Sequence, residues 1–392
     1  MVKRIVSLVL LITLLAPSAL GSSQSAMMGE DILSLCPTPS LPSSLPIGAL
    51  LALSGAASVY GEAQQNAILL AIDEINTSEF LGAGTTLDII FEDSASDDTR
   101  AMNAMTKLVL QDRVLAVLGP TLSREALAAN PIAQANSTIV LGVSLTAEGI
   151  TDLGEYIFRS SLPESIMIPA AVAAAAQRFS IQRVGVLFAN DDVFTISGYT
   201  AFTQALRQNG AQIIGEEAFA TGTVDFSAPL SRLIAAAPDA LAVSALAAEG
   251  IQIIMQARAL GYRGPIIGGN GFNSLAVLER TGADADGLIV GAAWSSESTN
   301  QLSQSFIGAY QMAFGEQPDQ FAVQAYTGAW LIAMAIRCAN SADRAAVRDA
   351  LAALEDVNTP LGLFSFDDDR NPVHEPIVQT ARGGVFVALP GS

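Results

Sequence analysis

The chain has 392 residues, of which 51% are hydrophobic and 15% are charged, and its formal net charge is -19. This length and composition predict one to three packed domains and exclude a disordered chain. The acidic balance argues against binding to nucleic acid or to an anionic membrane surface.

Residues 1–21 have the pattern of a cleaved signal peptide. Two basic residues at the start precede an apolar run, Ile5 to Ala16, that is too short to span a bilayer, and small residues follow at Ala19 to Gly21. We therefore expect export to the periplasm or another extracytoplasmic compartment. Residues 22–45 contain the sequence PTPSLPSSLP and are interpreted as a Pro/Ser-rich N-terminal arm without folded elements.

The chain has two cysteines, Cys36 and Cys338. Export would place them in an oxidising compartment, where a disulfide could join the arm to a helix of the core. Loop entropy would make such a bond worth roughly 4–5 kcal/mol. Lipidation of Cys36 is the alternative, but Leu35 precedes it where a lipoprotein signal has a small residue.

From residue 47 onward, β-rich runs alternate with helical segments. The first strand, Ile47 to Leu51, leads into a polar loop that contains Ser54 and Tyr60, two candidate ligand-binding residues. The next predicted elements are a helix over 62–76, a strand over 87–92 and a helix over 99–110.

The stretch 114–146 carries the first functional signal. An apolar run ending at Leu118 is broken by Gly-Pro, a helix begins at Ser123, and a second β-rich run precedes Ser144 and Thr146. Both loops open at one edge of a parallel sheet, where ligands collect. We expect these three hydroxyl residues to form half of a small-molecule clamp, with a carboxylate at the start of the helix. The alternative is an ordinary helix cap and two turn residues.

A second alternation of strands and helices begins after a domain crossing near Ser161 and continues to about residue 291. The number of units exceeds one ordinary sheet, so two doubly wound α/β lobes are predicted. Beyond Trp294 the sequence predicts helices over 301–314, 322–340 and 344–354, then antiparallel strands over 364–366, 375–379 and 384–389.

Several kinds of catalytic chemistry are missing from the sequence. The single histidine, His374, makes a zinc or iron site improbable, and no glycine precedes a lysine as a phosphate loop requires. The acidic pair Asp191 and Asp192 could act in acid–base catalysis, although a solvated loop or a helix start is the commoner role of such a pair. The sequence therefore predicts a binding protein with no metal and no cofactor.

Four segments resemble the leucine/isoleucine/valine-binding proteins of ABC importers, which have the periplasmic binding protein type I fold. They are IGALLALSGAASVYGEAQQNAILLAIDEIN, VLGPTLSREALAANPIAQ, IIGGNGFNS and FAVQAYTGAWLIAMAI, and the resemblance extends from Pro46 to Leu389. It implies two doubly wound, Rossmann-like α/β lobes joined by three crossovers. Lobe 1 would comprise residues 46–161 and 293–362, and lobe 2 would comprise residues 162–292 and 363–389.

The resemblance also implies roles for individual residues. Ser123 and Thr146, with the backbone near Ser144, would hold the ligand carboxylate. Tyr60 matches an aromatic residue that lies over the ligand, and Phe194 matches an aromatic residue of lobe 2. The alternative for both rings is packing in the core.

Two positions depart from the pattern of the amino-acid binders. Asn270 stands where they carry an acidic residue facing the ligand ammonium, and a neutral amide gives no charge pairing. Leu246 and Ala247 stand where they have aromatic residues. Glu164 or Asp192 is a candidate for the missing negative charge.

We therefore expect an extracytoplasmic, monomeric protein that captures a small molecule, first of all a branched-chain or other amino acid, and delivers it to an ABC permease in the membrane. An aliphatic or aromatic carboxylate or an amide is the alternative ligand. The same fold could instead report ligand occupancy to a signalling partner. An enzyme would require turnover by Asp191, Asp192 or His374.

Overall fold

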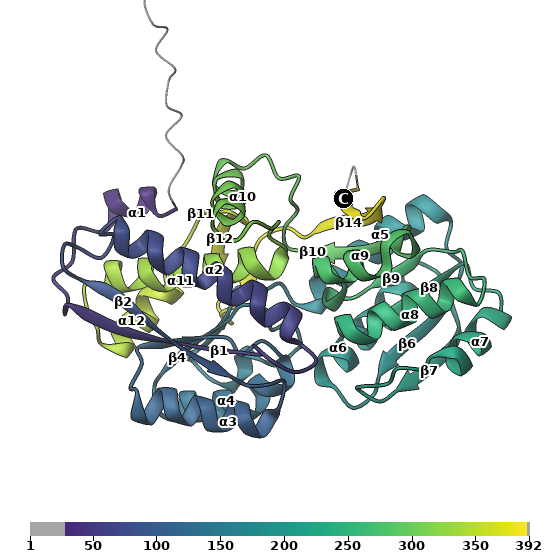
Figure 1. The fold of residues 1–392 in the computed structure, drawn as a ribbon, viewed down its shortest axis with the longest axis horizontal. Coiled ribbons are helices and arrows are strands. Elements are labelled where there is room, and N and C mark those ends of the chain that lie inside the picture. The colour runs from purple at the N-terminus through teal and green to yellow at the C-terminus, as the bar shows by residue number, and fades with distance from the viewer. Residues whose placement is uncertain (1–27, 390–392) are drawn as a thin grey trace, which may run out of the picture.

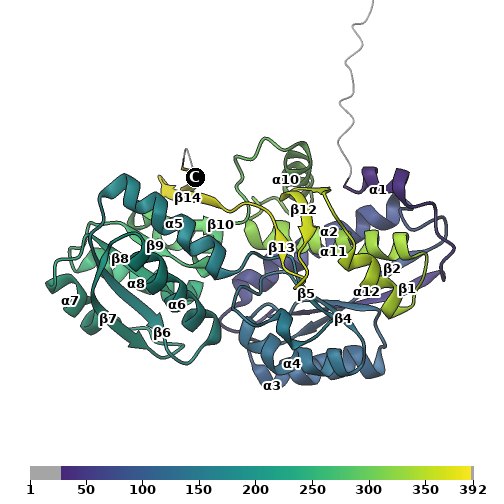
Figure 2. The ribbon, with the colours of Figure 1, turned by 180° about the vertical axis from the view of Figure 1, so that it is seen from behind.

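The structure is a computed structural model that describes residues 28–389, and the predicted signal peptide lies outside these residues. Two α/β lobes lie side by side, and the chain passes between them three times (Figures 1 and 2). The predicted fold class, two doubly wound lobes, is confirmed.

Lobe 1 is built on a five-stranded parallel sheet with the strand order β2-β1-β3-β4-β5. Its strands are β1 (Ser44–Leu51), β2 (Thr86–Asp93), β3 (Ala116–Leu118), β4 (Ile139–Gly142) and β5 (Ile157–Arg159). Its helices are α2 (Ser58–Thr77), α3 (Asp98–Thr106, continued by a π-helix over Lys107–Gln111), α4 (Ser123–Ala135), α10 (Gln301–Phe314), α11 (Gln320–Ala339) and α12 (Arg344–Ala352).

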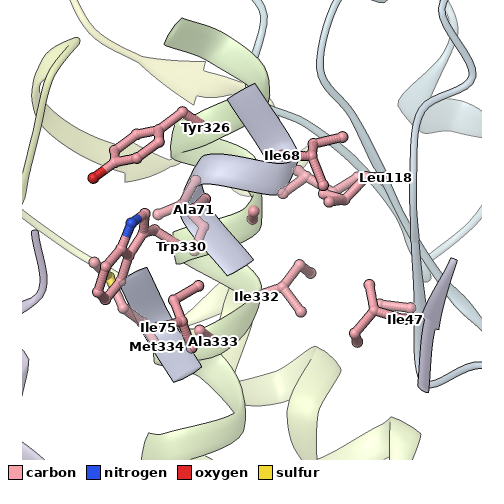
Figure 3. Close-up of a cluster of buried hydrophobic side chains, with 14 of the residues drawn as sticks. Ile47, Ile68, Ala71, Ile75, Leu118, Tyr326, Trp330, Ile332, Ala333 and Met334 are labelled. Atoms are coloured by element: carbon pink, nitrogen blue, oxygen red, sulfur yellow. The ribbon is translucent and has the colours of Figure 1, made fainter. Parts of the chain in front are cut away.

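The core of lobe 1 forms around α11, which is buried on all sides from its start to Arg337. Figure 3 shows Ile68 and Ala71 of α2 facing this helix, with Trp330 of α11 inside the cluster. Within residues 28–389, α11 is the one helix long and apolar enough to cross a membrane, but 94% of its apolar window is buried inside the protein. It is therefore a core helix, as its all-round hydrophobicity predicts.

The N-terminal arm is folded where the structure describes it, so the expectation of an unstructured arm is wrong for residues 28–45. It contains the short helix α1 (Glu30–Leu35) and is joined to α11 by a disulfide between Cys36 and Cys338. Arg337 also donates from Nε to the Cys36 carbonyl over 2.9 Å. Met28 and Ile32 are buried. The apolar side chains of the arm therefore pack against lobe 1, which the Pro/Ser content of the arm did not indicate.

Lobe 2 is built on a seven-stranded sheet with the order β15-β14-β10-β9-β8-β6-β7, in which β14 and β15 are antiparallel to their neighbours. Its strands are β6 (Arg183–Ala189), β7 (Gln212–Phe219), β8 (Ala240–Ser244), β9 (Ile266–Gly268), β10 (Leu288–Ala292), β14 (Ile377–Arg382) and β15 (Val385–Ala388). Its helices are α5 (Glu164–Phe179), α6 (Val193–Gln208), α7 (Ser227–Ala235), α8 (Ala247–Ala259) and α9 (Leu275–Thr281).

The third crossover lies later in the chain than residue 362, where we expected it. Strand β12 (Gly362–Phe366) pairs with β11 (Val357–Thr359) and with β13 (Pro372–Val373) in a small sheet. The turn after β12 is tied to lobe 1, because Arg159 of β5 donates its backbone N–H to the Arg370 carbonyl. The chain therefore enters lobe 2 between Val373 and β14. The sequence predicted a strand over 364–366, but the residue pattern of a strand does not indicate which strands it pairs with.

Candidate functional site

A cavity lies between the two lobes at the carboxyl ends of their parallel strands. In the conformation described, this cavity is narrow. The space open to the centres of water molecules is about 20 Å³, enough for a water molecule. The lining residues from lobe 1 are Tyr60, Thr121, Leu122, Ser123, Ser144 and Phe321, and those from lobe 2 are Asp192, Phe194, Leu246, Asn270 and Gly271.

The first turn of α4 provides the hydrogen-bond donors on the lobe 1 side. Ser123 is the first residue of this helix, and the N–H groups of a first helical turn have no partner within the helix. These groups and the helix dipole favour an anion. The Ser123 Oγ accepts from the Ala147 N–H over 3.3 Å, which leaves its hydroxyl hydrogen free to donate. The loop before α4 requires Gly119, because an added Cβ would collide with the Leu50 carbonyl oxygen.

A buried polar chain behind this turn fixes the other hydroxyl groups. Gln64 donates from Nε2 to the Ser144 Oγ over 2.8 Å and accepts from the Thr121 Oγ1 over 2.7 Å. The Ser144 hydroxyl in turn donates to the Thr121 carbonyl over 2.7 Å. Both hydroxyl groups are therefore engaged within the protein. Ser144 and Thr121 shape the wall, while the Ser123 hydroxyl remains available to a ligand.

Tyr60 connects the two lobes across the cavity. Its phenol donates to the Gly271 carbonyl over 2.9 Å and accepts from the Ala247 N–H over 2.6 Å, and both partners belong to lobe 2. Burial raises the pKa of this phenol, so it stays neutral. We expected Tyr60 in an exposed polar loop, but α2 begins at Ser58 and buries it.

Aromatic and aliphatic side chains form the apolar wall. Phe194 and Leu246 contribute from lobe 2, and Phe321 contributes from α11, where its ring packs on Tyr60 with 4.4 Å between centroids. Phe321 was not among the ligand-binding residues predicted from the sequence. This helix is apolar on every side, so nothing in its pattern distinguishes the one ring at its start that faces the cleft.

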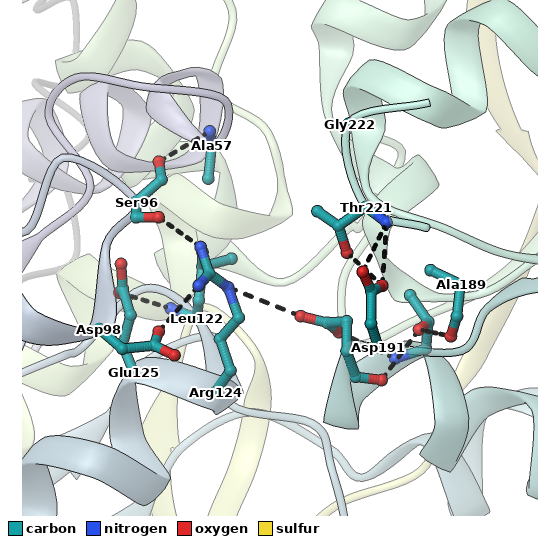
Figure 4. Close-up of polar contacts among 12 residues, drawn as sticks. Ala57, Ser96, Asp98, Leu122, Arg124, Glu125, Ala189, Asp191, Thr221 and Gly222 are labelled. Atoms are coloured by element: carbon teal, nitrogen blue, oxygen red, sulfur yellow. Dashed lines mark hydrogen bonds and ion pairs between the residues drawn. The ribbon is translucent and has the colours of Figure 1, made fainter. Parts of the chain in front are cut away.

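The acidic pair of lobe 2 has mainly structural partners. The Asp192 Oδ1 accepts from the Thr195 N–H over 3.1 Å and caps α6, while Oδ2 lies 3.7 Å from the Arg124 Nε of lobe 1. Burial raises the pKa of Asp192. Asp191 accepts from the backbone and hydroxyl of Thr221 (Figure 4). The two carboxylates thus point to different partners, which does not favour a shared acid–base role.

Glu164 lies behind the cavity wall. This residue begins α5, and its Oε1 accepts from the Asn270 N–H and from the Thr146 Oγ1, each over 3.1 Å. Burial raises the pKa of the Glu164 carboxyl to about 7. Neither Glu164 nor Thr146 lines the cavity in this conformation. Both are connected to the cavity wall by hydrogen bonds that lead to the backbone of Asn270.

Ser54 does not lie in the site. Its hydroxyl donates to the Asp93 Oδ2 over 2.6 Å at an exposed position, and it is absent from the cavity wall. Its loop placed it near Tyr60 in sequence, but the start of α2 sends the two side chains to different surroundings. His374 also lies away from the cavity, and residues 28–389 contain no cluster of three metal-ligating side chains.

Comparison with known proteins identifies the family. A profile of the periplasmic binding protein family matches residues 44–384. The chain belongs to this family. A leucine-, isoleucine-, valine-, threonine- and alanine-binding protein of Pseudomonas aeruginosa is 25% identical over 317 residues, which cover 81% of this chain and 84% of that protein.

Solved structures of the same fold match a similarly large share of this chain. The leucine-binding protein LivK of Thermotoga maritima has a TM-score of 0.83 at 23% identity, over 88% of this chain and 97% of that chain. The branched-chain amino acid transporter substrate-binding protein LivJ of Streptococcus pneumoniae, solved with isoleucine, has a TM-score of 0.81 at 27% identity. That match covers 88% of this chain and 100% of LivJ.

Proposed function

We propose that this protein is the extracytoplasmic, non-enzymatic solute-binding component of an ABC importer, which captures a branched-chain amino acid or a related small carboxylate. Family membership supports the binding role, and relatives named for leucine, isoleucine and valine binding support the ligand class. The observation that carries the proposal is the first turn of α4, whose free N–H groups and Ser123 hydroxyl meet an apolar cavity between two lobes.

Binding would couple to lobe closure. A ligand carboxylate held by lobe 1 would lose its water when Phe194 and Leu246 of lobe 2 cover it. Tyr60 would then hold the closed state through its bonds to Gly271 and Ala247. The closed pair of lobes is the form that a membrane permease would receive. We propose a monomer, because the cavity is complete within one chain.

Calorimetry of the purified protein tests the proposal after a thermal-shift screen of amino acids and small carboxylates, since a ligand that binds only the folded state raises the melting temperature. Ser123→Ala should weaken binding of the best ligand about tenfold or more, because a hydrogen bond to a charged group contributes about 1.5–3 kcal/mol. Ser227→Ala is the matched control, since Ser227 is also the first residue of a helix but is exposed on lobe 2. Equal affinities in both variants would remove Ser123 from the site.

A further inference from the structure

The orientation of the Asn270 side chain is fixed from outside the cavity. Its Oδ1 accepts from the Gln320 Nε2 over 2.6 Å and from the Asn273 Nδ2 over 3.3 Å. The acceptor oxygen and the donor nitrogen of an amide are bonded to the same carbon and point in different directions within one plane. With Oδ1 turned toward these two residues, the Nδ2 group is the part of Asn270 left for the cavity, which Asn270 lines.

Backbone groups determine which end of each partner amide faces Asn270. The Ala293 N–H donates to the Gln320 Oε1 over 2.6 Å, so the other end of Gln320 must be its donor. Asn273 donates to the Gly291 carbonyl over 2.9 Å, which fixes its Nδ2 in the same way. Backbone N–H and C=O groups cannot exchange roles. The chain of amides therefore ends in a donor at Asn270, and Nδ2 has no partner among residues 28–389.

The cavity consequently offers donors from both lobes. Lobe 1 offers the first turn of α4 and the Ser123 hydroxyl, and lobe 2 offers the Asn270 Nδ2. The Tyr60 phenol is engaged as both donor and acceptor. Asp192 is the one carboxylate in the described lining, and it is committed to the cap of α6 and to Arg124. An ammonium group can only donate, so it finds no partner at Asn270.

We infer that the preferred ligand is a small apolar carboxylate whose neighbouring substituent is a hydrogen-bond acceptor, a 2-oxo or 2-hydroxy acid, rather than a zwitterionic amino acid. This inference rests on the proposed solute-binding function and specifies the ligand within it. The carboxylate binds at the start of α4, the oxo or hydroxyl oxygen accepts from the Asn270 Nδ2, and the apolar chain lies against Phe194, Leu246 and Phe321. Because the cavity is narrow in this conformation, a molecule the size of leucine would enter with the lobes apart and contact both lobes once they close. Asn270 is the residue that determines specificity, and Gln320 is a positioning residue.

Calorimetric titration with L-leucine and with 4-methyl-2-oxopentanoate tests the inference, because these two probes share one carbon skeleton and differ only at the substituent in question. The wild-type protein should bind the oxo acid about tenfold more tightly or better, which corresponds to one hydrogen bond gained instead of one buried donor left unpaired. Asn270→Asp replaces the donor by a negative acceptor and should reverse the preference, with weaker oxo-acid binding and tighter leucine binding.

Gln320→Glu tests the positioning role without altering the cavity lining, which does not include Gln320. A glutamate can still accept from the Ala293 N–H, but it cannot donate to the Asn270 Oδ1. The Asn270 amide should then turn, present Oδ1 to the cavity and lower the ratio of oxo-acid to leucine affinity. The control is Asn103→Asp, the same chemical change at an exposed residue of α3, which should leave the ratio unchanged.

The possible results separate the two proposals. If the wild-type protein binds leucine more tightly than the oxo acid, or if neither Asn270→Asp nor Gln320→Glu changes the ratio of the two affinities, the inference about Asn270 is overturned while solute binding stands. If the wild type binds leucine or another amino acid but not the oxo acid, the outcome is the same. If no amino acid or carboxylate of any kind binds, the proposed function itself fails.

Discussion

Lobe 1 and lobe 2 present different chemistry to the cavity between them. Lobe 1 presents a helix start with Ser123, backed by the polar chain of Gln64, Thr121 and Ser144. Lobe 2 presents Phe194 and Leu246 and a single amide donor from Asn270, besides the engaged carboxylate of Asp192. From this difference we propose that lobe 1 would hold the charged end of a ligand and that lobe 2 would distinguish one ligand from another.

The two lobes also differ in how they are stabilised. Lobe 1 surrounds the buried helix α11, to which the disulfide ties the N-terminal arm across a sequence separation of 302 residues. In the loop-entropy argument such a closure is worth about 5 kcal/mol. Lobe 2 has no disulfide, because the chain has only these two cysteines. The disulfide therefore adds to the stability of lobe 1 and has no counterpart in lobe 2.

Among the tests of this comparison, Trp330→Ala should give the largest effect, a loss of unfolding free energy in lobe 1. Trp330 is fully buried at the centre of the lobe 1 cluster, and truncation of such a side chain costs about 3–5 kcal/mol of unfolding free energy. Urea denaturation measures the loss. Met312→Ala, at a position that is 89% exposed on α10, is the control and should change stability by less than about 0.5 kcal/mol. Equal stability of the two variants would show that α11 is not the centre of lobe 1.

The pH dependence of the free energy of unfolding should reveal a buried carboxyl group in each lobe. Burial raises the pKa of Glu125 in α4 and of Glu164 in α5 from 4.5 to about 7. Between these values the unfolded chain has released a proton that the folded protein still holds. The stability contributed by these two groups is therefore fully present below pH 4.5 and is lost as the pH rises toward 7. Each group contributes on the order of 3 kcal/mol to this fall.

Glu164→Gln and Glu125→Gln should each remove one share of this dependence. A further share remains in both variants, because burial also raises the pKa of Asp319 to about 6. Chemical denaturation at a series of pH values between 4 and 8 measures the slope for each variant and for the wild type. If neither substitution flattens the slope, the two carboxyl groups do not carry the pH dependence.

Tyr60→Phe should have the smallest of the three effects. It removes both bonds of the phenol to lobe 2 and leaves the Gly271 carbonyl and the Ala247 N–H unpaired in the closed state. The loss of about 1–2 kcal/mol should fall on closure and weaken ligand binding about tenfold, with little change in the unfolding of lobe 1. Calorimetry and urea denaturation together separate the two effects. A loss of fold stability without a loss of affinity would mean that Tyr60 is a packing residue.

The sequence by itself determined the features that depend on neighbouring residues. The alternation of strands and helices predicted two α/β lobes, and the Gly-Pro break before Ser123 predicted a helix start at the edge of a sheet. These patterns are local, because the periods of strands and helices and the preference for helix caps act over a few residues. The two cysteines predicted a bond that the structure contains, although export, rather than geometry, suggested it.

Only the tertiary structure decided which side chains share the cavity and how they are oriented. The Ser54 hydroxyl donates to Asp93 and does not line the cavity, whereas Phe321 lines it from the start of α11. The third crossover lies after β13. The direction of the Asn270 amide depends on Gln320, which is 50 residues away, and through it on the Ala293 N–H. Hydrogen bonds between such distant residues leave no periodic pattern in the sequence, so they become visible only when the lobes are folded and brought together.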